Sequence, residues 1–322
     1  MRIVIPDDYQ DCVRSLDCFA RLAGHEVRVF HDTVTGIDAL AERFADADAI
    51  VLTRERTRID AVLLERLPRL RIISQTGKLA GHVDLRACAA RGVVVTEGSG
   101  AGSATAELAW TLALASRRFL VQEAIGMRQG LWQRHLGQQL GGQRLGVWSY
   151  GRIGRQVAGF GKAFGMRVWV WGRQGSTDMA RRDGVEVAPS REAFFEDSDI
   201  ISLHVRLNPE TIGLVTACDL DRMKTTALLV NTSRAELIEP HALEQALVRG
   251  RPGFAAVDVY EQEPVMHPGH PLAALPNALC TPHIGYVERD NYERYFGIAF
   301  DNINRFADGR LEQAENAAAA AA

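Results

Sequence analysis

The sequence has few cysteines and none of the common metal-binding spacings. Its nine histidines form no H-E-x-x-H pattern, and no two cysteines form a C-x-x-C pair. We therefore expect no metal site. The five scattered cysteines are Cys12, Cys18, Cys88, Cys218 and Cys280. An odd number of this kind is typical of reduced thiols, which predicts a cytoplasmic protein.

The sequence also lacks a long hydrophobic run and a strong excess of charge. No apolar run reaches the roughly 20 residues of a transmembrane helix, and the start, MRIVIPDDYQ, becomes acidic too early for a signal peptide. The formal net charge of −3 argues against a nucleic-acid or membrane partner. With 47% hydrophobic and 24% charged residues among 322, the chain is typical of a globular protein of two domains. The final segment, Gln313 to Ala322, ends in six alanines and enters no functional prediction.

The stretch from Arg144 to Arg173 predicts a strand–turn–helix–strand unit of the size of a βαβ crossover. An apolar run over residues 145–148 precedes small residues, and a second apolar run covers residues 168–171. Between them, apolar residues recur at helical spacing and Gly165 ends the pattern. One helix face would carry Ile153, Val157, Phe160 and Phe164.

The turn in this unit has the spacing of a dinucleotide fingerprint, G-x-G-x-x-G, with serine in the first position. Gly151 would let the backbone approach a pyrophosphate, and Gly154 would let the helix pack closely on the strand. Ser149 is a departure from this pattern, and serine can make the tight turn if its φ stays negative. The predicted cofactor-binding residues of the turn are Ser149, Tyr150, Gly151, Arg152, Ile153 and Gly154.

The end of the second strand of this unit bears on the choice of cofactor. NAD sites usually place Asp or Glu there to bind the ribose hydroxyls, but this chain has Gly172 and Arg173 followed by no acid. Arginine binds a 2′-phosphate through charge-assisted hydrogen bonds, so we favour NADP over NAD. The alternative is a solvated loop arginine, or one that stacks on adenine.

Alternation of strands and helices along the whole chain predicts an α/β fold with two doubly wound parallel sheets. We expect one domain over residues 1–100 and 287–322, because a helix over residues 289–307 would return to the first domain. The dinucleotide-binding, Rossmann-like domain would cover residues 101–286. Within these domains we also expect a helix over residues 10–23 and a long helix after residue 103, capped by Ser103.

A loop over residues 75–82, QTGKLAGH, follows a predicted strand of the first domain. Ligands of open α/β sheets bind beyond the carboxyl ends of strands, and the two glycines of the loop could expose backbone amides to a carboxylate. The alternatives are a plain connecting loop and, for Lys78, a solvated side chain.

Three further stretches place polar residues at strand ends of the second domain. They are NTSR (residues 231–234), DVYEQEP (residues 258–264) and TPHIG (residues 281–285). Each alone is common in surface loops, but in a dinucleotide domain all three would point at one crevice.

These motifs, in this order after SYGRIG and together with LHVRLNPET (residues 203–211), resemble the D-isomer-specific 2-hydroxyacid dehydrogenases. The resemblance runs from about residue 72 to residue 285. It implies a nicotinamide-dependent oxidoreductase that interconverts D-2-hydroxy acids and 2-oxo acids. It also implies a discontinuous, flavodoxin-like substrate domain formed by both termini, and a homodimer, for which the long helix after Ser103 would be the interface.

The resemblance assigns the catalytic set to Arg234, Glu263 and His283. His283 would give a proton to the substrate carbonyl, Glu263 would hold the other ring nitrogen and favour the imidazolium, and Arg234 would polarise the carbonyl and bind the carboxylate. Backbone amides near Lys78 and Leu79 would hold the other side of the carboxylate. Thr232 and Asp258 would steady the nicotinamide end of the cofactor.

Other readings of the motifs remain open. Formate dehydrogenases share the fold but pair the histidine with glutamine, which Glu263 argues against. A dinucleotide-sensing binding protein of the co-repressor type would keep the same motifs with little turnover. A paralogue with a dead site is the third alternative. The departures from the family pattern are Ser149, Lys78 in the carboxylate loop, and Tyr286 where a small residue is usual.

Overall fold

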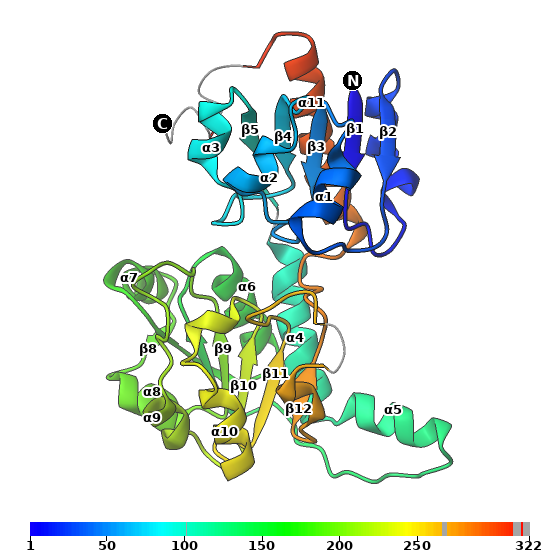
Figure 1. The fold of residues 1–322 in the computed structure, drawn as a ribbon. Helices are drawn as coiled ribbons and strands as arrows, with labels where there is room; N and C mark the ends of the chain where they lie inside the picture. Colours follow the sequence, from blue (N-terminus) through cyan, green and yellow to red (C-terminus); the bar gives the residue numbers. More distant parts are fainter. Residues whose placement is uncertain (101, 266–268, 312–316, 318–322) are drawn as a thin grey trace. The chain divides into compact units, whose positions relative to one another are not determined.

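The computed structural model describes residues 1–100, 102–265, 269–311 and 317, and the chain forms two compact units (Figure 1). The first unit consists of Met1–Ala101 with Glu288–Ala322, and the second is Gly102–Val287. The alanine-rich tail lies outside the described residues except for residue 317. Among the described helices, none is both long and apolar enough to cross a bilayer.

The first unit is built on a sheet whose described strands are all parallel and follow the order β2-β1-β3-β4-β5. This is the flavodoxin-like order. Its strands are β1 (Arg2–Ile5), β2 (Glu26–Val29), β3 (Ala49–Leu52), β4 (Ile72–Gln75) and β5 (Val94–Glu97). Both central strands β3 and β4 are buried along their whole length because helices cover both faces of the sheet.

The helices of the first unit are α1 (Ile37–Phe44), α2 (Ala61–Glu65), α3 (Leu85–Ala90) and α11 (Arg289–Ala307). Figure 1 shows α11 on the opposite face of the sheet from α1 and α2. The Ser74 hydroxyl on β4 donates to the Ala299 carbonyl of α11 at 3.0 Å. The C-terminal helix therefore packs against the N-terminal sheet.

The predicted helix over residues 10–23 is wrong. The structure has two short 3-10 segments instead, Val13–Ser15 and Asp17–Leu22, with an extended residue, Leu16, between them. The Asp8 carboxylate accepts hydrogen bonds from the backbone amides of Cys12 and Val13 at 3.1 and 3.0 Å. The amides at the start of the expected helix are therefore bonded to a side chain. Such local side-chain bonds compete with a regular helix.

The second unit contains a parallel sheet in the order β12-β11-β10-β9-β6-β7-β8 over its described strands. The order reverses beside β6, so the topological switch point lies between β6 and β9. The strands are β6 (Arg144–Trp148), β7 (Arg167–Trp171), β8 (Glu186–Val187), β9 (Ile200–Leu203), β10 (Leu228–Asn231), β11 (Phe254–Val257) and β12 (Ala278–Cys280). The α/β class with two parallel sheets is thus confirmed.

The helices of the second unit are α4 (Ser103–Arg117), α5 (Leu120–Arg128), α6 (Arg152–Ala163), α7 (Gln174–Arg182), α8 (Arg191–Asp197), α9 (Ala217–Arg222) and α10 (Ala242–Arg249). Short 3-10 turns lie at Ala235–Leu237 and Pro271–Ala274. The expected Ser103 cap is wrong, since Gly102 with φ +81° is the N-cap and Ser103 is already helical. The helix α7 had no counterpart in the sequence prediction.

Each face of the second sheet supports its own apolar core. Val147 on β6 belongs to the core with Val157 of α6 and Trp110 of α4. Its neighbour Trp148 belongs to the opposite core with Phe194 of α8. Successive residues of a strand point to opposite faces, so β6 packs into both cores. The turn that follows β6 therefore starts from a strand that is fixed on both faces.

Candidate functional site

The turn after β6 adopts a conformation that the sequence prediction did not expect. Ser149 has φ +76°, in the left-handed region, so the condition of a negative φ for serine in this turn is not met. Its amide donates to the Trp171 carbonyl of β7 at 2.8 Å, which fixes the turn against the next strand. A Cβ at Gly154 would collide with the Ser149 carbonyl. Close packing of α6 on this turn therefore requires glycine at position 154.

Replacing Ser149 with glycine is expected to raise the free energy of unfolding by about 1 kcal/mol, since a left-handed conformation costs an L-residue roughly 1–2 kcal/mol and glycine little. Denaturant titration of the purified chain measures the change. Ser149→Ala removes the hydroxyl but keeps the Cβ, and serves as the matched control with no gain. Equal stability of Ser149→Gly and the parent chain would contradict strain at this position.

The first turn of α6 presents backbone to open space. Gly151 is exposed and extended, and a Cβ built on it meets no atom within 4 Å. The Tyr150 amide donates to the Ser176 hydroxyl of α7 at 2.5 Å, which orients the turn. Ser176 was missed in the sequence, where no helix was expected after Arg173. An open helix N-terminus that follows a strand is suited to a phosphate group.

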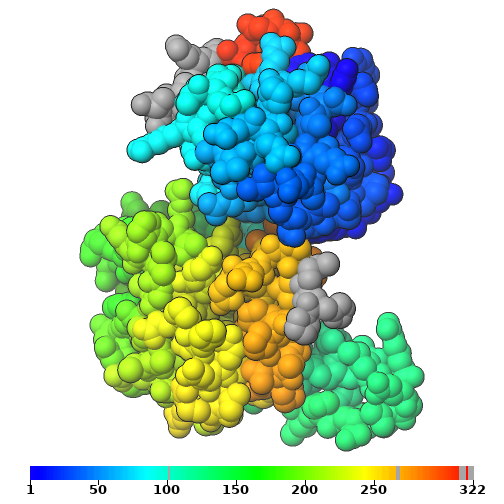
Figure 2. All heavy atoms as spheres, viewed as in Figure 1, coloured from blue at the N-terminus to red at the C-terminus, as the bar shows by residue number. Residues whose placement is uncertain are grey.

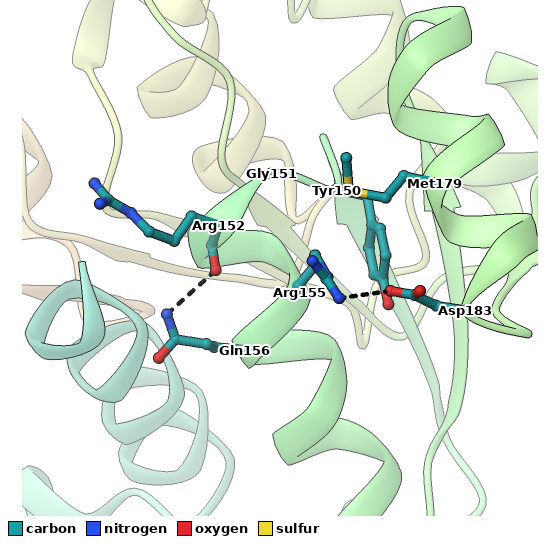
Figure 3. Close-up of a pocket in the computed structure, with 7 residues that line it drawn as sticks. All are labelled: Tyr150, Gly151, Arg152, Arg155, Gln156, Met179 and Asp183. Carbon is teal, nitrogen blue, oxygen red and sulfur yellow. Dashed lines mark hydrogen bonds and ion pairs between the residues drawn. The ribbon is translucent and has the colours of Figure 1, made fainter. Parts of the chain in front are cut away.

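A hollow of about 570 Å³ lies beside this turn, between α6 and α7 (Figure 3). Arg155 pairs with Asp183 at 3.1 Å across it, beside the ring of Tyr150. Burial, together with the Asp183 carboxylate, raises the pKa of the Tyr150 phenol. The side chain of Arg152 points away from this pair in Figure 3. Arg155 is therefore held by the ion pair with Asp183, and Arg152 is not part of that pair.

Arg173 lies at the N-cap of α7, directly after β7. Its guanidinium pairs with the Glu210 carboxylate at 3.1 Å, and both side chains are largely exposed. The structure therefore places Arg173 at the carboxyl end of a sheet strand, as expected. It also adds an acidic partner from the loop after β9 that the sequence prediction did not consider.

The NTSR segment at the end of β10 is shaped by the side chain of Asn231. Its amide oxygen accepts the Ser233 amide at 3.0 Å, and its amide nitrogen donates to the Arg234 carbonyl at 2.9 Å. The Arg234 guanidinium donates to the Ser233 carbonyl at 2.7 Å. Thr232 is buried, and its hydroxyl has no hydrogen-bond partner among the described residues. A buried orphan hydroxyl fits a position that a polar ligand completes.

Asp258, at the end of β11, is fully buried and holds the loop that carries His283. Its carboxylate accepts the Thr281 hydroxyl at 2.6 Å and the amides of Ile284 and Gly285 at 2.9 and 2.8 Å. Burial raises the pKa of this carboxyl, while the hydrogen bonds oppose the increase. The structure thus shows a positioning contact that the sequence prediction missed, and the expected contact with the cofactor stays a prediction.

His283 and Glu263 come together at the end of the second unit's sheet. The His283 Nδ1 atom lies 2.5 Å from Glu263 Oε2, and Glu263 Oε1 accepts the Tyr260 amide at 2.9 Å. His283 adopts φ +50°, and the Tyr286 ring packs edge-on at 5.3 Å between centroids. The neighbouring Glu261 pairs instead with His270 at 3.0 Å. Glu263 is therefore the histidine's partner, which leaves Nε2 of His283 as the atom able to exchange a proton.

In the first unit, the loop after β4 is tied to the end of β5. The Lys78 ammonium pairs with the Glu97 carboxylate, and the Leu79 amide donates to Glu97 Oε2 at 3.0 Å. Sequence reasoning missed Glu97. In the sheet, Glu97 stands opposite Gln75 where both strands end, and this register is seen only in the structure.

Comparisons with known proteins give a consistent result. Residues 110–285 match the NAD binding domain of the D-isomer specific 2-hydroxyacid dehydrogenases. A glyoxylate reductase from Aeropyrum pernix is 37% identical over 284 residues, covering 85% of this chain and 84% of that protein. A solved structure from Ralstonia solanacearum, provisionally named a D-3-phosphoglycerate dehydrogenase, is 51% identical with a TM-score of 0.96, covering 99% of this chain and 97% of that one. A phosphoglycerate oxidoreductase structure from Vibrio cholerae O395 is 47% identical with a TM-score of 0.93, covering 96% and 99%.

Proposed function

Because the chain belongs to the D-isomer-specific 2-hydroxyacid dehydrogenase family, we propose that it is an NADPH-preferring reductase of small 2-oxo acids whose proton donor is His283. The family resemblance and the reaction class, hydride transfer at a CH–OH group with NAD(P), are confirmed by that membership. The observation that carries the proposal is the contact between His283 Nδ1 and Glu263 Oε2 at 2.5 Å.

Reduction of a 2-oxo acid needs a hydride at the carbonyl carbon and a proton at its oxygen. The nicotinamide supplies the hydride when it is bound. His283 gives the proton from Nε2, because Glu263 holds Nδ1 and leaves Nε2 to face the substrate. The Arg234 guanidinium donates hydrogen bonds to the carbonyl oxygen and the substrate carboxylate, which stabilises charge that develops on the oxygen. In the first unit, the loop of Lys78 and Leu79 binds the carboxylate.

The residues around the turn after β6 fit a dinucleotide. The exposed N-terminus of α6 at Gly151 has the open space and the amides that a pyrophosphate needs. The orphan hydroxyl of Thr232 lies at the end of β10 in the same sheet and is suited to a polar group of the cofactor. Both observations support the proposed cofactor-binding set, of which residues 149–154 form the core.

The proposed preference for NADPH rests on Arg173. A 2′-phosphate would replace Glu210 as its partner, because phosphate offers more acceptors to a guanidinium than one carboxylate does. Arg173→Asp is expected to lower kcat/KM for NADPH by on the order of tenfold or more. The value of kcat/KM for NADH should rise relative to the value for NADPH. Initial rates with both cofactors measure the shift.

Glu210→Gln is the matched control for that experiment, since it removes the competing carboxylate and keeps Arg173. It should strengthen NADPH binding, or leave it unchanged, while Arg173→Asp weakens it. An unaltered ratio of the two kcat/KM values in Arg173→Asp would show that Arg173 does not select the cofactor.

An assay of turnover distinguishes the proposed reductase from a dinucleotide-sensing binding protein. Purified protein is mixed with NADPH and a panel of glyoxylate, hydroxypyruvate, pyruvate and phosphohydroxypyruvate, and oxidation is followed at 340 nm. The panel reflects the glyoxylate reductase and phosphoglycerate oxidoreductase names of its relatives. Cofactor binding without turnover of any of these acids would instead support a dinucleotide sensor.

We also propose a homodimer, with an interface that differs from the expected one. Of the predicted interface helix, α4, only Glu107 and Thr111 are exposed. By contrast, α5 and the loop after it expose a group of large apolar side chains, and Figures 1 and 2 show this segment extending from the rest of the second unit. The exposed apolar side chains of this segment are Leu120, Val121, Ile125, Met127, Leu131, Trp132 and Leu136. Large exposed apolar patches mark interaction sites, and sedimentation of the purified chain tests the assembly.

The five cysteines carry free thiols, including the exposed Cys218. This supports the proposed cytoplasmic location, because thiols stay reduced there.

A further inference from the structure

The loop that the proposed function assigns to the substrate carboxylate already holds a carboxylate of the chain itself. Glu97 Oε2 accepts the Leu79 amide at 3.0 Å, while Oε1 is paired with the Lys78 ammonium. Glu97 thereby engages one amide donor and one cation of this loop at once. A free monocarboxylate would be bound by the same two kinds of group.

The position of Glu97 is fixed by the packing of the ends of β4 and β5. Glu97 ends β5 opposite Gln75 of β4. The next residue, Gly98, donates its amide to the Gly77 carbonyl at 2.8 Å, and a Cβ there would lie 3.0 Å from the Gly77 amide. The two strand ends are thus packed backbone to backbone. This close packing brings the Glu97 side chain to the Leu79 amide.

We propose that Glu97 lowers the affinity for the substrate by competing with its carboxylate for the Leu79 amide. This inference rests on the proposed function, since it requires that the loop bind the substrate. A carboxylate ligand must displace Glu97 from Leu79. It then lies beside a second negative charge, which Lys78 offsets only in part.

The two members of the pair have opposite effects on substrate binding under this proposal. Glu97 weakens the binding of an anion through competition and like-charge repulsion. Lys78 strengthens it, because it can move its hydrogen bonds from Glu97 to the incoming carboxylate. Its side chain is more exposed than that of Glu97, at 67% against 33%, and so is able to follow the ligand.

The test compares Glu97→Gln and Lys78→Met in steady-state reduction of glyoxylate with NADPH. Glu97→Gln keeps an oxygen that can accept the Leu79 amide and removes only the charge, so the loop keeps its shape. It should lower the KM for glyoxylate by roughly tenfold with kcat changed less than twofold, and Lys78→Met should raise the KM by a similar factor. The inhibition constant of oxamate, a carboxylate that is not reduced, should move in the same directions.

Glu26→Gln is the matched control, since it removes an exposed glutamate of the same unit that pairs with Arg2 at 3.7 Å. Its KM should equal that of the parent chain. A raised KM in Glu97→Gln would show that the charge of Glu97 supports substrate binding, and that result overturns the proposal. An unchanged KM in Glu97→Gln also overturns it. If the parent chain reduces no 2-oxo acid of the panel, the proposed function fails instead, which is a distinct outcome.

Discussion

Replacing His283 with alanine is expected to lower kcat for 2-oxo acid reduction by on the order of 10² or more, which is the usual scale of general acid catalysis. The imidazole is the proposed proton source, and water is a poorer acid at neutral pH. Binding of NADPH should stay the same, because the turn after β6 does not depend on this ring. Stopped-flow or steady-state rates, with a fluorescence titration of NADPH, separate the two effects.

His270→Ala is the control for that substitution. His270 also pairs with a glutamate, Glu261, at 3.0 Å, and it lies in the same part of the second unit. Its loss should leave kcat within twofold of the parent value. A normal kcat in His283→Ala would remove this histidine from the mechanism, whatever the behaviour of His270.

Replacing Arg234 with glutamine is expected to lower kcat/KM by on the order of 10² to 10³, in line with the loss of a donor to a developing oxyanion. Glutamine keeps a donor but lacks the charge and the paired N–H groups of guanidinium. The fold should tolerate the change, since the Asn231 side chain bonds to the backbone of this segment and not to the Arg234 side chain.

Arg249→Gln provides the comparison for Arg234→Gln. Arg249 lies in α10 and forms an exposed ion pair with Asp221 at 2.8 Å. An exposed pair of this kind contributes roughly 0–1 kcal/mol to stability, so its removal should leave the kinetics unchanged. Comparable losses in both variants would indicate a general effect of positive charge instead of a specific role for Arg234.

The sequence predicted the parts of the site that depend on strand ends. Parallel strands bring their carboxyl ends to one edge, so Arg234, Glu263 and His283 follow β10, β11 and β12 once those strands are recognised. The position of the glutamate before proline in DVYEQEP distinguished Glu263 from Glu261, and the structure joins Glu263 to His283. The catalytic roles of these residues remain predictions that the substitutions above test.

The parts that could not be predicted depend on a single backbone angle or on contacts between distant residues. The positive φ of Ser149 is imposed by its bond to Trp171 and by the close approach of Gly154, and local propensity does not reveal it. The carboxylate of Asp8 breaks up the expected helix over residues 10–23. Glu97 required the register of β4 against β5, which the sequence alone does not fix.

The hydrogen bonds of Asp258 have a consequence for how substrate binding could be changed in this chain. Glu263, His283 and the carboxylate that holds the histidine loop all belong to the second unit. The Lys78–Glu97 pair belongs to the first. Under the proposed roles, substitutions in the first unit would alter how tightly the acid is bound without breaking any bond that orients His283. Substrate binding and proton donation would then be separable, and the loop after β4 would be the region in which to engineer binding.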